Sequence, residues 1–210
     1  GTLALPKTVT KIEPFAFYNC SGFTGDLNLN YVVDGIGSYA FYRCSGIETI
    51  ILNPKIYSIS NYTFYKCTNL KQIVNISVFF NIISSYAFYG CEKLSGPLTF
   101  STNLLEVGDY AFYECTSLKG PLYLGFGLKR IGQFAFCHCS KLSGSLRLGN
   151  YEYVNLKFVI GDYAFYGCTS FTGNLSLFNV SNIGRYAFYQ SGFSGSLSVP
   201  RTSIGDYAFY

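Results

Sequence analysis

The sequence predicts a repeat solenoid, in which short coils of the chain stack in parallel along one axis. Two observations support this fold. Close copies of IGDYAFYGCTS, the stretch from Ile160 to Ser170, recur along the whole chain, and most copies precede a short segment of alternating apolar and polar residues. The copies align on a small residue followed by Phe, at Ala16, Ala40, Thr63, Ala87, Ala111, Ala135, Ala164, Ala187 and Ala208.

The mean spacing of these copies is about 24 residues, which is the length of leucine-rich repeats. A unit this short cannot bury its own apolar face, so its neighbours must cover it. The sequence therefore predicts a leucine-rich repeat array of ~24-residue coils. Each coil is expected to contain a short parallel β-strand and a short helical turn, and the strands are expected to form one curved parallel sheet.

Composition favours one continuous array over several globular domains. Charged residues make up 12% of the chain and aromatic residues 19%, so apolar material is ample for a core that runs its full length. The chain opens in the strand half of a repeat and stops at Tyr210, directly after a motif Phe. We therefore expect residues 1–210 to form a single solenoid that is a fragment of a longer array and lacks both caps.

The charge pattern excludes one class of partner. The net charge is only +4, and the Lys and Arg residues are scattered rather than clustered. No stripe of basic residues suits a phosphate backbone, so no nucleic-acid partner is predicted. No run of 18 apolar residues occurs either, so no membrane insertion is expected within this segment.

The first half of each repeat is predicted to form the turn. The residue before the first aromatic is Ser, Asn or Asp in most copies, as at Ser38, Asp109 and Asp162, and such side chains cap helix starts. A catalytic role for these carboxylates is disfavoured because Arg185 occupies the same position. The motif Phe is expected to point inward, with the flanking Tyr residues on the outer edge.

A cysteine follows the motif Phe by three residues in seven copies, and Ser191 or Gln190 takes its place in the eighth. One cysteine per coil indicates a small buried side chain that fills a narrow turn. Disulfides between neighbouring coils are the alternative, because adjacent rungs lie within bridging distance. The seven are Cys20, Cys44, Cys67, Cys91, Cys115, Cys139 and Cys168.

The second half of each repeat alternates as a strand does, as in Leu27-Asn28-Leu29 and Leu146-Arg147-Leu148. The middle residue of each strand is expected to face outward. The predicted outward column contains Asn28, Ile51, Val74, Thr99, Tyr123, Arg147, Ser176 and Ser198.

With these strands joined to I-G-x-x-A-F-x-x-C turns, the chain resembles BspA-like leucine-rich repeat proteins, also described as the Treponema pallidum type. Residues 36–44 and 160–168 carry all the positions of the motif, while Thr63, the missing eighth cysteine and the longer spacing after Ala135 depart from it. The resemblance implies a microbial cell-surface or secreted protein that adheres to host cells or matrix proteins. Ligands vary within this family, so it implies no ligand-contacting residues.

The residue pattern does not favour a catalytic or metal-binding site. His138 is the only histidine, and its neighbours in Cys137-His138-Cys139 cannot all turn toward one metal ion. No C-x-x-C pair completes a site, and no glycine-rich motif follows a strand to bind a nucleotide. We predict no catalytic residues, no metal and no cofactor.

The leading functional hypothesis is a non-enzymatic adhesion or protein–protein interaction module at the cell surface or secreted. Its partner would be a protein of the host-cell surface or extracellular matrix, or a glycan. The signal and anchor segments would lie outside this stretch. One alternative is a carbohydrate-active β-solenoid enzyme, which should concentrate charged residues on one face, yet the outward column has only Arg147. An intracellular leucine-rich repeat scaffold is a further alternative.

The candidate partner-binding site lies at the longest insertion, between Leu148 and Ile160, because solenoid insertions loop out of the coil. The candidate residues combine the insertion with the sheet before it. They are Tyr123, Arg147, Tyr151, Tyr153 and Lys157. Tyr and Arg are the residue types enriched at interface hot spots. In the alternative interpretation, Val154, Leu156 and Phe158 fold into an enlarged coil and the tyrosines pack on it.

Overall fold

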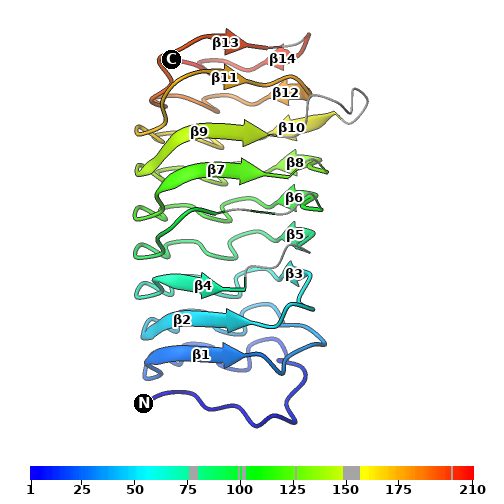
Figure 1. The fold of residues 1–210 in the computed structure, drawn as a ribbon, viewed down its shortest axis with the longest axis vertical. Coiled ribbons are helices and arrows are strands. Elements are labelled where there is room, and N and C mark those ends of the chain that lie inside the picture. The colour runs from blue at the N-terminus through cyan, green and yellow to red at the C-terminus, as the bar shows by residue number, and fades with distance from the viewer. Residues whose placement is uncertain (76–79, 99, 101–102, 126, 149–156, 200) are drawn as a thin grey trace.

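The chain winds into a parallel β-solenoid whose coils stack from the N-terminus at one end to the C-terminus at the other (Figure 1). The computed structural model describes residues 1–75, 80–98, 100, 103–125, 127–148, 157–199 and 201–210. Every strand pairing is parallel, and each strand pairs with strands of neighbouring coils. The predicted solenoid is therefore confirmed.

One set of strands comes from the alternating Leu segments. It comprises β1 (Gly25–Leu29), β2 (Ile47–Leu52), β4 (Gln72–Val74), β7 (Gly120–Leu124), β9 (Leu142–Leu148), β11 (Leu175–Ser176) and β13 (Leu197–Ser198). We call the surface that they form the Leu-strand face. It consists of three separate sheets, β1-β2-β4, β7-β9 and β11-β13.

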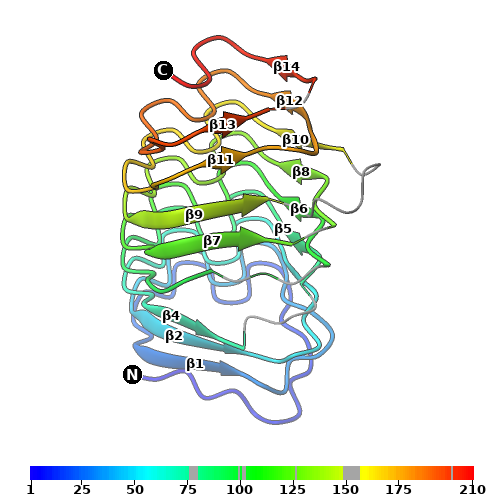
Figure 2. The same ribbon diagram turned by 45° about the horizontal axis from the view of Figure 1, so that its top comes forward.

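A second set of strands lies at the other side of each coil (Figure 2). It forms one continuous seven-stranded sheet in the order β14-β12-β10-β8-β6-β5-β3. Its members are β3 (Ser58–Ile59), β5 (Ile82–Ile83), β6 (Glu106–Val107), β8 (Arg130–Ile131), β10 (Phe158–Ile160), β12 (Val180–Ile183) and β14 (Ser203–Ile204). The prediction of one sheet is thus wrong: the coil has two strands, and the sheet that was predicted is the interrupted one.

The Ile-Gly pair of the motif lies where coils of the second sheet approach closely. The Gly108 amide donates to the Ile83 carbonyl of the preceding coil at 2.7 Å. A Cβ atom on Gly108 would lie 2.5 Å from the backbone nitrogen of Ser85, so a side chain there would force the coils to shift. Ser60 and Ser84 occupy the same position after β3 and β5, so glycine favours this contact locally and is not required in every coil.

The Leu-strand face is interrupted after β4, where the next coil contains Gly96 and Pro97. Gly96 has φ = 101°, and Pro97 has no amide hydrogen to donate to a neighbouring strand. The Ser95 amide still donates to the Lys71 carbonyl at 3.0 Å, and Gly96 forms a bridge to Leu118 in the following coil. Periodicity does not reveal this interruption because Leu98 keeps its apolar position, and the Gly-Pro pair alone does not cause it, since Gly120 and Pro121 lie inside β7.

The Tyr-Ala-Phe-Tyr segments form consecutive turns, and the described residues contain no helix. The Tyr39 amide donates to the Asn61 carbonyl of the next coil (3.0 Å), whereas the Tyr42 amide donates back to the Tyr39 carbonyl (3.2 Å). Tyr39 and Arg43 have φ values of 60° and 55°. A helix needs every residue in the right-handed region, so the predicted helical turn is not confirmed.

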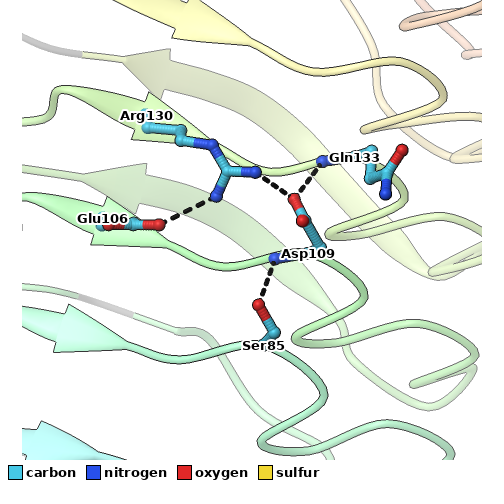
Figure 3. A network of polar contacts seen from close by, with 5 residues as sticks. All are labelled: Ser85, Glu106, Asp109, Arg130 and Gln133. Carbon is cyan, nitrogen blue, oxygen red and sulfur yellow. Dashed lines mark hydrogen bonds and ion pairs between the residues drawn. The ribbon is translucent and has the colours of Figure 1, made fainter. Parts of the chain in front are cut away.

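The polar residue before the first aromatic does not cap a helix, which corrects its predicted role. Its side chain instead accepts the amide hydrogen of the equivalent residue in the next coil. Ser85 Oγ accepts from Asp109 N at 3.2 Å, and Asp109 Oδ1 accepts from Gln133 N at 2.9 Å (Figure 3). Asp162 Oδ1 accepts from Arg185 N at 2.8 Å. These side chains connect neighbouring coils.

Three departures from the repeat are accommodated without breaking the stack. Thr63 replaces Ala and is fully buried, and its hydroxyl donates to the Ser60 carbonyl at 2.8 Å. Ser191 takes the cysteine position, because its amide donates to the Phe188 carbonyl as the cysteine amides do in other coils. The long insertion connects β9 to β10.

The motif Phe residues form a continuous stack along the interior, as predicted. Successive ring centroids lie 5.1–5.5 Å apart, with interplanar angles of 13° or less. Leu and Ile residues from both sets of strands complete the core. The stack contains Phe17, Phe41, Phe64, Phe88, Phe112, Phe136, Phe165, Phe188 and Phe209.

We expect the Phe stack, rather than the Asp positions, to control stability. Phe165 is fully buried between Phe136 and Phe188, so Phe165→Ala should lower the free energy of unfolding by ~3–5 kcal/mol. Asp162→Ala removes one accepted amide hydrogen bond and should cost about 1 kcal/mol. Urea denaturation of the two variants measures both values. A larger loss for Asp162→Ala would contradict this account of the core.

Candidate interaction surface

The outer edge of the turns carries two ladders of stacked aromatic rings. In the first ladder, from Phe15 through Tyr39 to Tyr207, successive ring centroids lie 4.5–5.1 Å apart. The second ladder runs from Tyr18 to Tyr113 at 4.7–4.8 Å and resumes at Tyr166. Because each ring covers the face of its neighbour, the ladders expose mainly ring edges and hydroxyl groups.

Stacking also holds the tyrosine hydroxyls in their neutral form. Burial by the neighbouring rings raises the pKa of Tyr62, Tyr65 and Tyr110. For Tyr89, burial and then the nearby Glu114 carboxylate raise the pKa to about 12. This face can therefore donate and accept hydrogen bonds, but its phenols are poor nucleophiles at neutral pH.

Both ladders lack tyrosine in the coil that contains Phe136. Phe134 occupies the first ladder, and Cys137 occupies the second, where it is buried. His138 is exposed, and its ring occupies the space left by the missing Tyr. It packs edge-on against Tyr113 and Tyr166, with centroids 5.9 and 5.4 Å away. No group of three His, Cys, Asp or Glu side chains suited to a metal ion occurs among the described residues.

The motif cysteines form a fourth ladder beside the Phe stack. Each thiol from Cys44 to Cys168 donates to the carbonyl of the motif Phe in the preceding coil, at Sγ–O distances of 3.0–3.3 Å. All eight cysteines are free thiols, so the structure favours the predicted buried role over the disulfide alternative. The hydrogen bond itself was not predicted, although the constant spacing between Phe and Cys was its signal.

Burial makes these thiols unreactive. Desolvation raises the pKa of Cys44 to about 12, and it raises the pKa values of Cys67, Cys115 and Cys168 well above the ordinary range. Desolvation and then the Glu114 carboxylate raise the pKa of Cys137 to about 12. Since the thiolate is the nucleophile and the metal ligand, these groups suit packing and not chemistry.

Tyr123 and Arg147 from the predicted site meet on the Leu-strand face. They are register partners on β7 and β9, where Arg147 is exposed and Tyr123 is partly buried. The Arg147 guanidinium lies 5.3 Å from the centroid of the Tyr123 ring, a cation–π contact. The outward column holds the same register elsewhere, at Asn28–Ile51–Val74 and Ser176–Ser198, while Thr99 lies outside the described residues.

The other residues of the predicted site are placed only in part. Lys157 is exposed and directly precedes β10, in the second sheet. No hydrogen bond or ion pair joins Lys157 to Tyr123 or Arg147 within the part of the chain that the structure describes. Tyr151 and Tyr153 lie outside the described residues, as do Val154 and Leu156. Phe158 is buried, as the enlarged-coil interpretation expected.

A network of charged side chains on neighbouring coils was not predicted from the sequence. The Arg130 guanidinium bonds the Glu106 carboxylate at 2.8 Å and also the Asp109 carboxylate (Figure 3). Glu106 and Arg130 are register partners on β6 and β8, so aligning the repeats would have placed them side by side. Partly exposed ion pairs of this kind contribute little to stability. Each charged group in the network already has a partner of opposite charge.

Comparison with known proteins identifies the repeats. Residues 1–119, 74–155 and 147–210 match the family model described as the BspA type leucine rich repeat region. The chain belongs to the BspA-type leucine-rich repeat family. No curated protein matches this BspA-type chain in sequence.

Solved structures of bacterial leucine-rich repeat proteins share the fold. A leucine-rich repeat protein from Bacteroides ovatus is 25% identical, with a TM-score of 0.77 over 96% of the BspA-type chain. The Treponema pallidum leucine-rich repeat protein is 24% identical over 86%, with a TM-score of 0.63 and 72% of its own length covered. A leucine-rich cell surface protein from Faecalibacterium prausnitzii is 21% identical over 95%, with a TM-score of 0.57 and 66% of its length covered. The chain spans 56% of the length of the B. ovatus protein.

We expect the thiols of this BspA-type chain to be free but protected. Titration with a thiol reagent at pH 8 should detect Cys20, which is half-buried, before the seven buried cysteines. All eight should react after denaturation without reductant. A smaller count in denaturant would reveal disulfides and contradict the ladder of donating thiols.

The raised thiol pKa values predict alkaline destabilisation. Between the ordinary thiol pKa of 9.0 and the folded value of about 12 for Cys137, the unfolded chain loses a proton that the folded chain retains. Stability should therefore be intact below pH 9 and fall as pH rises, by up to about 1.4 kcal/mol per pH unit for each such group. Urea denaturation at pH 8 and 10.5 tests this dependence. Cys137→Ala should fall less steeply than the parent, and identical slopes would refute the assignment.

Proposed function

We propose that this chain is the binding part of a non-enzymatic cell-surface or secreted adhesin that binds host-cell or extracellular-matrix proteins. The observation that carries the proposal is the long, regular outer surface of BspA-type repeats, backed by a continuous Phe core. A stacked array of this kind presents many side chains at fixed spacing over an extended area, which suits recognition of large partners.

The state of the reactive side chains favours binding over catalysis. Burial raises the pKa values of thiols such as Cys44 and Cys137 and of ladder tyrosines such as Tyr62 and Tyr89, so these groups are held neutral. His138 packs between two tyrosine rings and is partnered with no carboxylate in the described hydrogen bonds. A carbohydrate-active enzyme would instead need paired acidic groups at one place on the surface.

Placement at the cell surface is part of the proposal. Its support is the family of the repeats, together with a structural neighbour that is itself described as a cell surface protein. No helix with the length and hydropathy of a membrane span occurs among the described residues. The full-length gene would test this placement directly, because a surface adhesin requires a signal segment and an anchor.

We assign the principal protein contact to Tyr123, Arg147, Tyr151, Tyr153 and Lys157. The Tyr123–Arg147 pair supports this assignment, because Arg147 is exposed, Tyr123 is partly exposed, and the two side chains are already ordered against each other. An ordered Tyr–Arg pair loses little conformational entropy when a partner binds. Both residue types are also enriched at binding hot spots.

Removing this pair should weaken adhesion. Tyr123→Ala combined with Arg147→Ala should reduce affinity for immobilised matrix proteins or host cells by about tenfold or more, as loss of a hot spot does. Biolayer interferometry and cell-adhesion counts measure the effect. Tyr57→Ala combined with Arg201→Ala is the matched control, since it removes the same side-chain types from exposed positions on other coils. Two further variants are measured separately: the double change Tyr151→Ala with Tyr153→Ala, and the single change Lys157→Ala.

Variants in the outer tyrosine ladders test whether the whole aromatic edge, rather than the Tyr123–Arg147 site, binds the partner. Tyr42→Phe and Tyr89→Phe remove two hydroxyls but preserve the stacked rings. If these changes reduced adhesion as much as the Tyr123 and Arg147 changes, the whole aromatic edge would be the binding surface. A local site at the insertion would then be ruled out.

A further inference from the structure

A cationic groove lies beside the outer aromatic ladder at the N-terminal end of the solenoid. Its volume is about 450 Å³. In the three coils that form it, the residues before and after the ladder cysteine are exposed or partly exposed, whereas Cys44 and Cys67 are buried. Three neighbouring coils line the groove with Asn19, Ser21, Arg43, Ser45, Lys66 and Thr68.

The groove places two positive charges on adjacent coils without a negative partner. Arg43 and Lys66 occupy equivalent positions on adjacent coils, so their backbones lie about 4.8 Å apart. Neither side chain forms an ion pair with any residue that the structure describes. Like charges held side by side repel each other, so an anion bound between them would relieve that repulsion as well as gain two contacts.

Both cations are held in place before any ligand arrives. The Arg43 guanidinium lies 5.4 Å from the Tyr42 ring centroid, and the Lys66 ammonium lies 5.9 Å from the Tyr65 ring centroid. The Lys66 side chain also crosses Gly90 in the next coil, where a Cβ atom would lie 3.2 Å from its Cγ. Ordered side chains lose less entropy on binding, which favours a preformed site.

The acidic residues of the same columns begin only beyond the groove. Glu92 follows Thr68 in the column after the cysteine, and Glu114 follows Gly90 in the column before it. Neither carboxylate lines the groove. The positive end of this surface therefore lies at Arg43, away from the acids, and an anionic group should bind nearest to that residue.

The lining indicates the chemistry of the ligand. Every lining side chain can donate a hydrogen bond, through an amide, a hydroxyl, a guanidinium or an ammonium group. No apolar side chain lines the groove, so it offers no pocket for the hydrophobic residues that peptide ligands use as anchors. A ligand rich in hydroxyl and sulfate groups matches this lining better than an acidic peptide does.

We propose that this groove binds the sulfate groups of a sulfated polysaccharide chain. Arg43 and Lys66 hold the sulfate oxygens through charge-assisted hydrogen bonds, and Ser21, Ser45 and Thr68 bond the sugar hydroxyls. This second site rests on the proposed function only in needing an extracellular location. It uses a different face and a different ligand class from the Tyr123–Arg147 contact.

Binding of a heparin octasaccharide to the purified chain tests the proposal. Arg43→Gln combined with Lys66→Gln should weaken binding at least about tenfold, because two charge-assisted contacts are lost. Lys119→Gln combined with Lys141→Gln is the matched control, since it lowers the net charge equally from exposed positions outside the groove. The control should change affinity less than about twofold, because screened charges outside the contact matter little. Isothermal titration calorimetry at 150 mM salt measures each value.

Three further binding measurements make the result decisive. Ser45→Asp should abolish binding by adding a negative charge while both cations remain, and unchanged thermal melting would show that the variant folds. The desulfated octasaccharide should not bind. Equal losses in the two Gln pairs would mean nonspecific attraction to net charge, and tighter binding of an acidic octapeptide would mean a protein ligand. Either result would overturn the proposal.

The two sites can fail separately. If both proposals hold, the Arg43 and Lys66 changes leave adhesion to matrix protein intact, and the Tyr123 and Arg147 changes leave octasaccharide affinity intact. If the Tyr123 and Arg147 changes reduce protein adhesion but leave octasaccharide affinity unchanged, the result supports two separate sites. Loss of octasaccharide binding in the Tyr123 and Arg147 variant would contradict the placement in this groove.

Discussion

The structure depends on backbone hydrogen bonds that alternate between and within coils in the Tyr-Ala-Phe-Tyr segment. One amide donates along the stack axis to the next coil, as Phe41 does to Thr63 at 2.9 Å, and the following amide closes a turn within its own coil. This alternation requires left-handed backbone at residues such as Tyr39. Left-handed backbone costs a β-branched or aromatic residue energy, and the stacked rings on both sides offset that cost by burying apolar surface in every coil.

The same bonds fix what the surface can do. The backbone sets the spacing between coils, so equivalent side chains form columns along the stack. Identical aromatic residues in a column stack on one another, whereas a column of different residues changes in charge and polarity from coil to coil. Stacked tyrosines yield a regular face on which burial raises the pKa of hydroxyls such as those of Tyr62 and Tyr89. Arg43, Lys66, Tyr123 and Arg147 instead lie in columns whose residues differ from coil to coil. Both proposed binding sites lie in such variable columns, and the repeat itself supplies rigidity.

The cysteine ladder shows how packing and polarity are satisfied together. From Phe17 to Phe136, the carbonyl of each motif Phe accepts the amide of its own coil and the thiol of the next, as Phe41 does from Cys44 and Cys67. A buried carbonyl without a partner would cost free energy, and a larger polar side chain would not fit beside the Phe stack. Cysteine is small and apolar enough for the core, and it still donates a weak hydrogen bond. Its raised pKa is a consequence of this position and not a sign of reactivity.

The sequence by itself determined the solenoid, the inward Phe column, the outward Tyr edge and the register that brings Tyr123 beside Arg147, because each follows from residue spacing. Tertiary structure alone decided the second sheet, the interruption at Pro97 and the left-handed turns that replaced the expected helices. It also decided that Asp162 bonds the next coil, and that Arg43 and Lys66 share a groove. The physical reason is that these features arise from contacts between coils, where hydrogen-bond direction and close approach decide the conformation, and periodicity within one coil carries no record of them.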